Sequence, residues 1–485
     1  MSFRFSSVGL ALWLALPAAH AESPSLEQAG ALEAKGDFNG AAGVLTQALA
    51  LASLAQPERK EIGFELDRLE RVRKDYPFTK DELFAALKKS VRDVTEVEFE
   101  RWVAEGRFDS RNIDGERRFM GSSVSNLYFR YPELNSRRVE PKDPAQFEQT
   151  VLIATREIAN AAYTEQKPYV LPKRFRVTMT VTAASNATPA GEIIRAWLPI
   201  PRRYPFQKDF KLRQTSSRVK HLEAETSSIR SVFLEQQATK NKPTEFKIEY
   251  DYTAYGVRIE VAPEKVRGCD PNVPALLPFL REAPHVVFTP EMRALSQQIV
   301  GGETNAYLKA RKFYQWITGN IRYSYALEYS TIRNLGEYCR AHGYGDCGQE
   351  ALLFITLCRL NGIPARWQSG WFTFPGGKTI HDWVEIYLPP YGWMPVDPYM
   401  GIWAMRYVHS LSDDEKREVR DFYFGGLDQW RMAANSDHSQ ALTPPKQSLR
   451  SDTVDFQRGE LERGTNNIYF DQYSYKLDVT ELRSK

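Results

Sequence analysis

Cysteine and net charge are both scarce in this sequence. The 485 residues include 4 cysteines, far too few for a scaffold held together by disulfides. None of them forms a Cys-x-x-Cys pair, so the sequence does not predict a structural zinc site. The formal net charge is +3, too close to neutral to favour nucleic acid or an anionic membrane as the main partner. What remains is an ordinary globular composition, with 42% hydrophobic and 26% charged residues.

A long apolar run is also missing from most of the chain. After the first 21 residues, no segment approaches the ~18 apolar residues of a membrane-spanning helix. The N-terminus has the pattern of a secretory signal: Arg4, a short apolar run over residues 8–16, and the small-residue cleavage site Ala19-His20-Ala21. We therefore expect cleavage after Ala21 and a periplasmic or secreted mature chain without a transmembrane segment. The alternative is an N-terminal anchor that is not cleaved.

The hydrophobic pattern divides the chain that follows residues 1–21 into four regions. Residues 22–168 show mainly helical periodicity, although we expect an extended segment over residues 122–131. Residues 169–266 alternate apolar and polar residues, as in an antiparallel β domain. Helical patterns return in residues 267–401, which also hold the motifs described below. Residues 402–485 offer too few apolar residues for a separate core, so we expect a C-terminal extension that packs on the region before it.

Cys347 lies in an environment that is typical of a reactive thiol. It follows the turn residues Gly345 and Asp346 and begins a segment with an apolar helical pattern. Unpaired N–H groups at a helix start favour a thiolate and can donate to a developing oxyanion. The neighbours Gly345 and Gly348 would let a substrate backbone approach closely. The alternative for any single cysteine is a small core hydrophobe, which is what we expect of Cys358 on the same helix.

A histidine and an aspartate follow Cys347 in the chain. His381 lies on the predicted return strand of a hairpin, and Asp397 ends the next predicted strand. Adjacent antiparallel strands could place Asp397 beside one nitrogen of His381, so that the other nitrogen faces the thiol. The candidate catalytic residues are therefore Cys347, His381 and Asp397, and the candidate cleft residues are Gly345, Gly348 and Trp383.

Three motifs in this order resemble the transglutaminase-like superfamily. They are Gly345-x-Cys347-x-x-x-Ala351, His381-Asp382-Trp383 and Gly392-Trp393-x-Pro-Val-Asp397-Pro, within residues 306–401. The resemblance implies an α+β fold with a papain-like core, in which a helix bearing the cysteine packs on an antiparallel sheet. It also implies Cys347 as nucleophile, His381 as base and acid, and Asp397 as the residue that orients the imidazole. The preceding β region resembles, in pattern only, the β-sandwich-like domain of some bacterial members.

The family also places an aromatic oxyanion donor upstream of the cysteine, and its animal members need calcium. Trp316, Tyr323 and Tyr325 are the candidates for the donor, and each could equally be a core residue. No Asp-x-Asp-x-Asp-Gly loop occurs, so we expect no metal and no cofactor. His342 is a weaker candidate base than His381, because no carboxylate nearby in the sequence is an evident partner for it.

The function indicated by these residues is acyl transfer through a Cys347 thioester, on a peptide or protein substrate that could be a cell-wall peptide. Water as acceptor gives a peptidase or amidase, and an amine gives a cross-linking transglutaminase. The lack of a calcium loop favours hydrolysis. A non-enzymatic scaffold or binding protein is the other class, and the presence of all three candidate residues disfavours it. Metal-dependent hydrolysis lacks a His-Glu-x-x-His motif.

Two questions stay open at this point. Cys269 and Cys339 could form a disulfide or remain two free thiols. The sequence also gives no indication of the oligomeric state.

Overall fold

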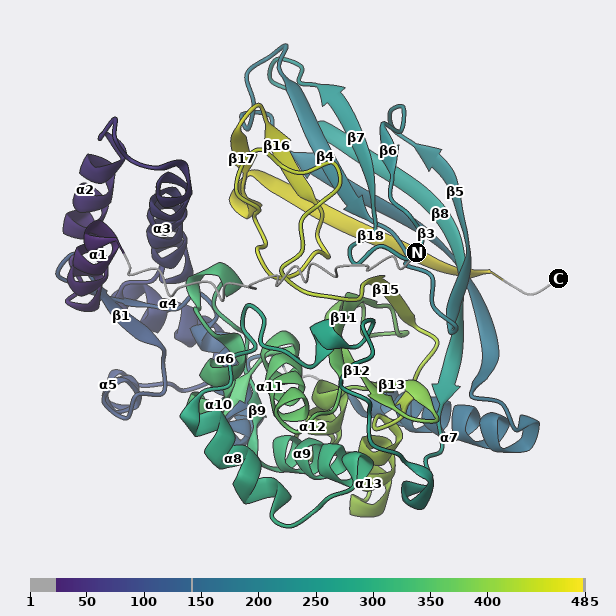
Figure 1. The fold of residues 1–485 in the computed structure, drawn as a ribbon. Coiled ribbons are helices and arrows are strands. Elements are labelled where there is room, and N and C mark those ends of the chain that lie inside the picture. The colour runs from purple at the N-terminus through teal and green to yellow at the C-terminus, as the bar shows by residue number, and fades with distance from the viewer. Residues whose placement is uncertain (1–22, 141–142, 483–485) are drawn as a thin grey trace, which may run out of the picture.

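The computed structural model describes residues 23–140 and 143–482, so the expected signal peptide lies outside the described residues. Helices and antiparallel sheets combine in the chain, which confirms the predicted α+β class (Figure 1). No helix in the described part is both long enough and apolar enough to cross a membrane.

The N-terminal region consists mainly of helices. They are α1 (Pro24–Ala34), α2 (Phe38–Leu49), α3 (Gln56–Asp75), α4 (Lys80–Ser90), α5 (Glu96–Ala104), α6 (Ser123–Arg130) and α7 (Ala145–Glu165), with a 3-10 helix at Pro132–Arg137. A small hairpin, β1 (Ser110–Ile113) with β2 (Glu116–Phe119), interrupts them. The prediction of an extended segment over 122–131 was wrong. Ser123, Leu127 and Arg130 are buried at helical spacing, and this one-sided burial favours α6 over a strand.

The β region forms two five-stranded sheets, which occupy the upper right of Figure 1. The first has the order β14-β8-β3-β18, with β5 also on β8, and the second has the order β17-β16-β4-β7-β6. Their strands from this region are β3 (Tyr169–Ala183), β4 (Ile193–Pro199), β5 (Gln207–Thr215), β6 (His221–Leu222), β7 (Ser231–Gln237) and β8 (Thr244–Arg258).

The C-terminal extension contributes strands to both of these sheets, which the sequence analysis did not foresee. They are β14 (Gly426–Leu427), β16 (Glu460–Arg463), β17 (Asn466–Ile468) and β18 (Tyr473–Leu482). β18 pairs with β3 along its whole length, and β16 pairs with β4. Figure 1 shows the yellow strands β16, β17 and β18 beside the teal ones. Residues 431–435 of the extension also pair with residues 369–372 of the region before it. The region boundaries stay a prediction.

The third part of the fold carries the motifs. A four-stranded antiparallel sheet has the order β13-β12-β11-β15, and a short parallel pair joins β9 to β10. The strands are β9 (Arg322–Tyr323), β10 (Tyr344–Gly345), β11 (Ala365–Phe372), β12 (Thr379–Leu388), β13 (Gly392–Val396) and β15 (Arg431–Asn435). The helices are α8 (Pro290–Val300), α9 (Ala306–Asn320), α10 (Leu335–His342), α11 (Cys347–Leu360), α12 (Pro398–Arg406) and α13 (Asp413–Phe422). Further 3-10 turns lie at Pro263–Lys265, Leu277–Phe279, Tyr329–Thr331 and Phe470–Gln472.

The helix α11 is the centre of the largest hydrophobic core. Its apolar side chains, from Ala351 to Cys358, pack with Val384 and Ile386 of β12 and with Trp367 of β11. A helix that is apolar on nearly all sides is expected to be buried, and here it is covered by the sheet and by α8, α9, α10 and α12. This packing fixes the position of the first residue of α11, which is Cys347.

All four cysteines are free thiols in the structure. The open choice for Cys269 and Cys339 is therefore resolved in favour of two free thiols. Cys358 is fully buried in the core around α11, as expected.

Candidate active site

Cys347 is the first residue of α11, and its backbone is held by a capping box. The side chain of Asp346 accepts a hydrogen bond from the backbone N–H of Gln349, and the Gln349 side chain accepts one from the backbone of Asp346. The hydroxyl of Tyr329 donates to Asp346 at 2.7 Å. The predicted helix start is thus present, and Cys347 is half-buried there.

The thiol of Cys347 donates a hydrogen bond to Asp382, with Sγ 3.3 Å from Oδ2. No hydrogen bond joins Cys347 to His381, although the sequence analysis expected the imidazole to face the thiol. Successive strand residues point to opposite faces of a sheet. Asp382 shares the face of β12 that packs on α11, whereas His381 lies on the other face, with its ring stacked on Trp383. Burial, followed by the charges of Asp382 and Asp346, raises the pKa of the Cys347 thiol.

His381 and Asp397 form the expected pair. The strands β12 and β13 are paired at Val384 and Val396, which brings the residue after β13 to the start of β12. His381 Nε2 lies 2.8 Å from Asp397 Oδ2, and both side chains are buried. The imidazole Nδ1 makes no hydrogen bond to any residue in 23–140 or 143–482, so it is free to serve a substrate or the thiol.

Asp397 is held in place by two further contacts. Its Oδ1 accepts from the backbone of Met400 at 3.0 Å, which makes Asp397 the N-cap of α12. Its Oδ2 lies 2.8 Å from Nη1 of Arg431, a guanidinium on β15 that also pairs with Asp428 at 2.8 Å. Burial opposes ionisation of Asp397, but the charges of His381 and Arg431 hold the pKa of its carboxyl below the usual value.

The C-terminal extension supplies a second set of contacts to the site. Gln457 Nε2 donates to Asp382 Oδ1 at 2.7 Å and to the backbone oxygen of His381 at 2.9 Å. Asp455, which accepts from Ser369 and Asn435, lies next to Asp382. Burial and this second carboxyl raise the pKa of Asp382 well above its usual value. The sequence analysis missed Arg431, Asp455 and Gln457, and no local motif marks them.

Two hollows meet at the candidate residues. Cys347 and Asp382 line a cleft of about 840 Å³, and His381 lines a neighbouring cavity of about 460 Å³. Tyr323, Tyr325 and Thr379 line both, so the two hollows adjoin. The smaller one is mainly aromatic, and the ring of Tyr399 in its wall lies 5.3 Å from the ring of His381. The imidazole and the thiol thus belong to adjoining hollows.

Two of the three oxyanion candidates lie near the thiol. Tyr323 and Tyr325 line both hollows, and their rings are 5.5 Å apart. Trp316 lines neither, because it packs against the core around α11. His342 is exposed on the end of α10, where its Nδ1 lies 2.9 Å from the backbone oxygen of Tyr338.

The three predicted cleft residues do not line the cleft. Trp383 is fully buried and packs toward the β region with Val257 and Leu427. A Cβ on Gly345 would meet Gln349 and Cys339, and one on Gly348 would meet Tyr329, Asp382 and Trp367. Both glycines are therefore needed for close packing inside the protein, which corrects the expectation that they face a substrate.

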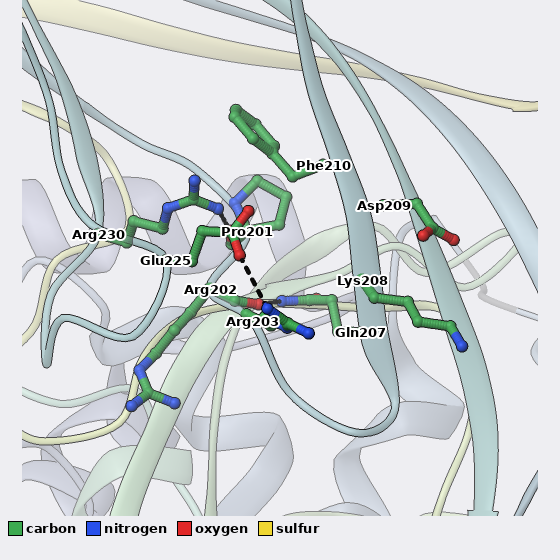
Figure 2. Close-up of a pocket in the computed structure, with 9 residues that line it drawn as sticks. All are labelled: Pro201, Arg202, Arg203, Gln207, Lys208, Asp209, Phe210, Glu225 and Arg230. Atoms are coloured by element: carbon green, nitrogen blue, oxygen red, sulfur yellow. Dashed lines mark hydrogen bonds and ion pairs between the residues drawn. The ribbon is translucent and has the colours of Figure 1, made fainter.

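A separate hollow of about 260 Å³ lies in the β region, between the ends of β4 and β5. Figure 2 shows that its basic side chains point in different directions, with Arg202, Lys208 and Arg230 on three sides. Arg203 pairs with Glu225 at 3.5 Å, and Arg230 donates to backbone oxygens. These groups do not converge on one point, so they do not form a site comparable to the cleft at Cys347. In the described part of the chain, no group of three or more His, Cys, Asp or Glu side chains is arranged to hold a metal ion.

Comparison with known proteins adds a family to this geometry. Residues 293–398 match the model of the transglutaminase-like superfamily. An uncharacterised protein from Haemophilus influenzae is 23% identical over 235 residues, which are 42% of this chain and 62% of that protein. Uncharacterised protein YebA from Bacillus subtilis is 26% identical over 129 residues, 23% of this chain and 17% of YebA. The chain thus spans less than two thirds of the length of each relative.

Two solved structures are similar in part. A candidate cysteine protease from Cytophaga hutchinsonii is 14% identical, with a TM-score of 0.43, over 65% of this chain and 93% of that one. The periplasmic domain of TgpA from Pseudomonas aeruginosa is 14% identical, with a TM-score of 0.26, over 47% of this chain and 96% of that one.

The family match covers the helix start with Cys347, the strand with His381 and the cap residue Asp397, and it ends one residue later. Arg431 and Gln457 lie outside it. Residues 293–398 of the chain thus match the transglutaminase-like superfamily.

Proposed function

We propose that this protein is a cysteine-dependent hydrolase of peptide or carboxamide bonds that works through a thioester on Cys347. The observation that carries the proposal is the buried His381–Asp397 pair, 2.8 Å apart, in which His381 lies on the strand that also holds the thiol's partner Asp382. Asp397 fixes the imidazole with Nε2 toward the carboxylate, which leaves Nδ1 for proton transfer. The adjoining hollows, one lined by His381 and the other by Cys347, give room for a substrate.

In the first half of the reaction, the Cys347 sulfur attacks the carbonyl carbon of the substrate. His381 takes the thiol proton and gives it to the leaving nitrogen, so a C–S bond forms, a C–N bond breaks and an amine departs. The backbone N–H groups at the start of α11 are the oxyanion donors that the helix geometry offers, with the hydroxyls of Tyr323 and Tyr325 as further candidates.

In the second half, water attacks the thioester and passes a proton to His381. The C–S bond breaks, the acid leaves and the thiol regains its proton. Arg431 keeps Asp397 ionised throughout, so that the carboxylate can stabilise the imidazolium form of His381.

The resting geometry requires one change before attack. The thiol has to leave Asp382 and turn toward Nδ1 of His381. A substrate that fills the boundary between the two hollows would displace the thiol from the carboxyl, and the reaction would then begin only when substrate is bound. We also propose a periplasmic or exported location, because the N-terminal signal pattern would direct the chain there.

The test is a peptide and carboxamide hydrolysis assay with three variants. Cys347→Ala and His381→Ala are expected to abolish turnover, whereas Cys269→Ala, which removes a thiol outside both hollows, leaves it unchanged. Parallel reactions with an added primary amine measure the acceptor. Turnover that persists in Cys347→Ala contradicts the proposal. If the acyl group is recovered as an amide of the added amine and not as the free acid, the reaction is amine transfer and not hydrolysis.

A further inference from the structure

Arg458 is a basic residue in the wall of the 840 Å³ cleft that contains Cys347. Its Nε is buried without a hydrogen-bond partner. Within residues 23–140 and 143–482, its guanidinium forms no ion pair and no hydrogen bond, and its Cζ lies over the ring of Phe470, 4.6 Å from the ring centre. The other basic residue of the cleft, Lys74, is paired with Asp471. Arg458 is thus the cation of the cleft that has no direct partner among the described residues.

The residue before Arg458 contacts the candidate catalytic residues. The preceding residue, Gln457, donates to the carboxyl of Asp382 at 2.7 Å and to the backbone of His381 at 2.9 Å. Asp382 in turn accepts from the Cys347 thiol. Because Phe470 supports the guanidinium from one side, Arg458 is held at a fixed place in the same cleft as the nucleophile.

The carboxyls that stabilise the charge of Arg458 have other partners. Asp452 accepts from the backbone of Val454 at 3.1 Å and of Asp455 at 2.8 Å. Glu328 accepts from the hydroxyl of Tyr469 at 3.2 Å. These two groups support the cationic form of Arg458 without bonding to it.

The cleft also carries less negative charge than its seven carboxyl groups suggest. Those groups are Asp75, Glu328, Asp346, Asp382, Asp452, Asp455 and Asp471. Burial raises the pKa of Asp75 and of Asp346 to about 6, and it raises the pKa values of Glu328, Asp382 and Asp455 as well. Burial thus disfavours the charged form of these carboxyls, whereas an arginine stays charged.

We propose that Arg458 binds a carboxylate of the substrate, so that the preferred substrate is a peptide with a carboxylate close to the bond that is cleaved. The inference rests on the proposed function, because it concerns the substrate of the same cleft. A guanidinium presents two parallel N–H groups, and a carboxylate accepts both. An acidic side chain and a free C-terminus offer the same chemistry, and the experiment below separates them.

The experiment compares three otherwise identical peptides: one neutral and amidated, one amidated with a glutamate next to the cleaved bond, and one with a free C-terminus at that distance. Wild-type protein is expected to turn over at least one carboxylate peptide with a kcat/KM about tenfold above the neutral one. In Arg458→Gln this advantage is lost through KM, and turnover of the neutral peptide stays the same. Arg458→Lys restores part of the advantage, because it keeps the charge but not the paired donors.

Lys74→Gln is the matched control, since it removes a charge from the same cleft at a residue that already has a partner. It is expected to leave all three rates unchanged. Binding of the same peptides to Cys347→Ala, measured by calorimetry, tests Arg458 without catalysis, and there Arg458→Gln is expected to weaken only the carboxylate peptides about tenfold. If Arg458→Gln weakens the binding of neutral and anionic peptides equally, or if the wild-type protein prefers neutral peptides, Arg458 does not have the proposed role. Absence of turnover together with intact selective binding counts against the hydrolase and for the carboxylate site.

Discussion

The thiol of Cys347 lies 3.3 Å from Asp382, and this makes a buried carboxyl its partner in the resting protein. Asp382 is the residue next to His381, so the strand β12 presents two different proton acceptors to the site, one on each face. A carboxylate beside a thiol disfavours loss of the thiol proton, because the thiolate would face a like charge. The proposed nucleophile is therefore restrained by the same strand that carries the proposed base, His381.

Removal of this restraint should make Cys347 more reactive. In Asp382→Asn, the carboxyl whose charge opposes ionisation of the Cys347 thiol is gone, so the pKa of Cys347 falls and alkylation extends to lower pH. We expect the iodoacetamide rate at neutral pH to rise between about threefold and tenfold, since one pKa unit is a factor of ten in thiolate. The rate is measured from pH 5 to 9, with the modified cysteine mapped by mass spectrometry. Cys269 is the internal control, and an unchanged profile for Cys347 would refute the restraint.

Arg431 should be essential to both stability and activity. It lies between the buried carboxylates Asp397 and Asp428, so Arg431→Met leaves two acidic groups without their cation. Loss of one partner of a buried ion pair costs about 3–5 kcal/mol, which urea denaturation can measure. Arg431→Lys keeps the charge and should lose less stability. If Arg431→Met is as stable as the wild type, the ion pairs of Arg431 with Asp397 and Asp428 do not stabilise the site.

Gly370 on β11 should be as important for stability as the ion pairs of Arg431. A Cβ on Gly370 would come within 1.8 Å of the backbone oxygen of Met432, on the strand that carries Arg431. Gly370→Ala should therefore separate β15 from β11, lower the unfolding temperature and reduce activity. Gly319→Ala, in the last turn of α9, meets no atom within 4 Å and is expected to leave both unchanged. Equal behaviour of the two variants in a thermal melt would contradict this packing.

The pairing of Asp397 gives a dependence of stability on pH. Its carboxyl has a lowered pKa in the folded protein, so its contribution is complete above the usual carboxyl value of about 3.9 and is lost as the pH falls through the lower folded value. Asp397→Asn lacks this contribution at every pH. The stability difference between wild type and variant should shrink as the pH falls below about 4, as followed by chemical denaturation. A stability difference that stays constant through that pH range would indicate that the contacts of Asp397 do not lower the pKa of its carboxyl.

The candidate catalytic residues could be named from the sequence because each is bound to a local pattern. A turn followed by an apolar helix predicts the position of Cys347, and two strands joined by a short turn predict that Asp397 meets His381. Alternation along a strand and periodicity along a helix are short-range properties, and they determine these contacts.

The contacts of the extension could not be predicted in this way. Arg431 lies 34 residues beyond Asp397, and Gln457 lies 76 residues beyond His381. The pairing of β18 with β3 joins Tyr473 to Ala183. Alternation shows that a segment is a strand, but it does not choose its partner among distant strands. The prediction that Trp383 lines the cleft was wrong for a related reason. Strand alternation places Trp383 on the same face as His381, but it does not determine whether that face meets solvent or the β region.

The central claim is that Cys347 carries the acyl group, and mass spectrometry of protein quenched in acid during turnover tests it most directly. The account predicts a mass increase equal to the acyl part of the peptide, located on Cys347, removed by hydroxylamine and absent in Cys347→Ala. Active protein that carries no acyl group on Cys347 at any time, with turnover that continues in Cys347→Ala, would contradict it.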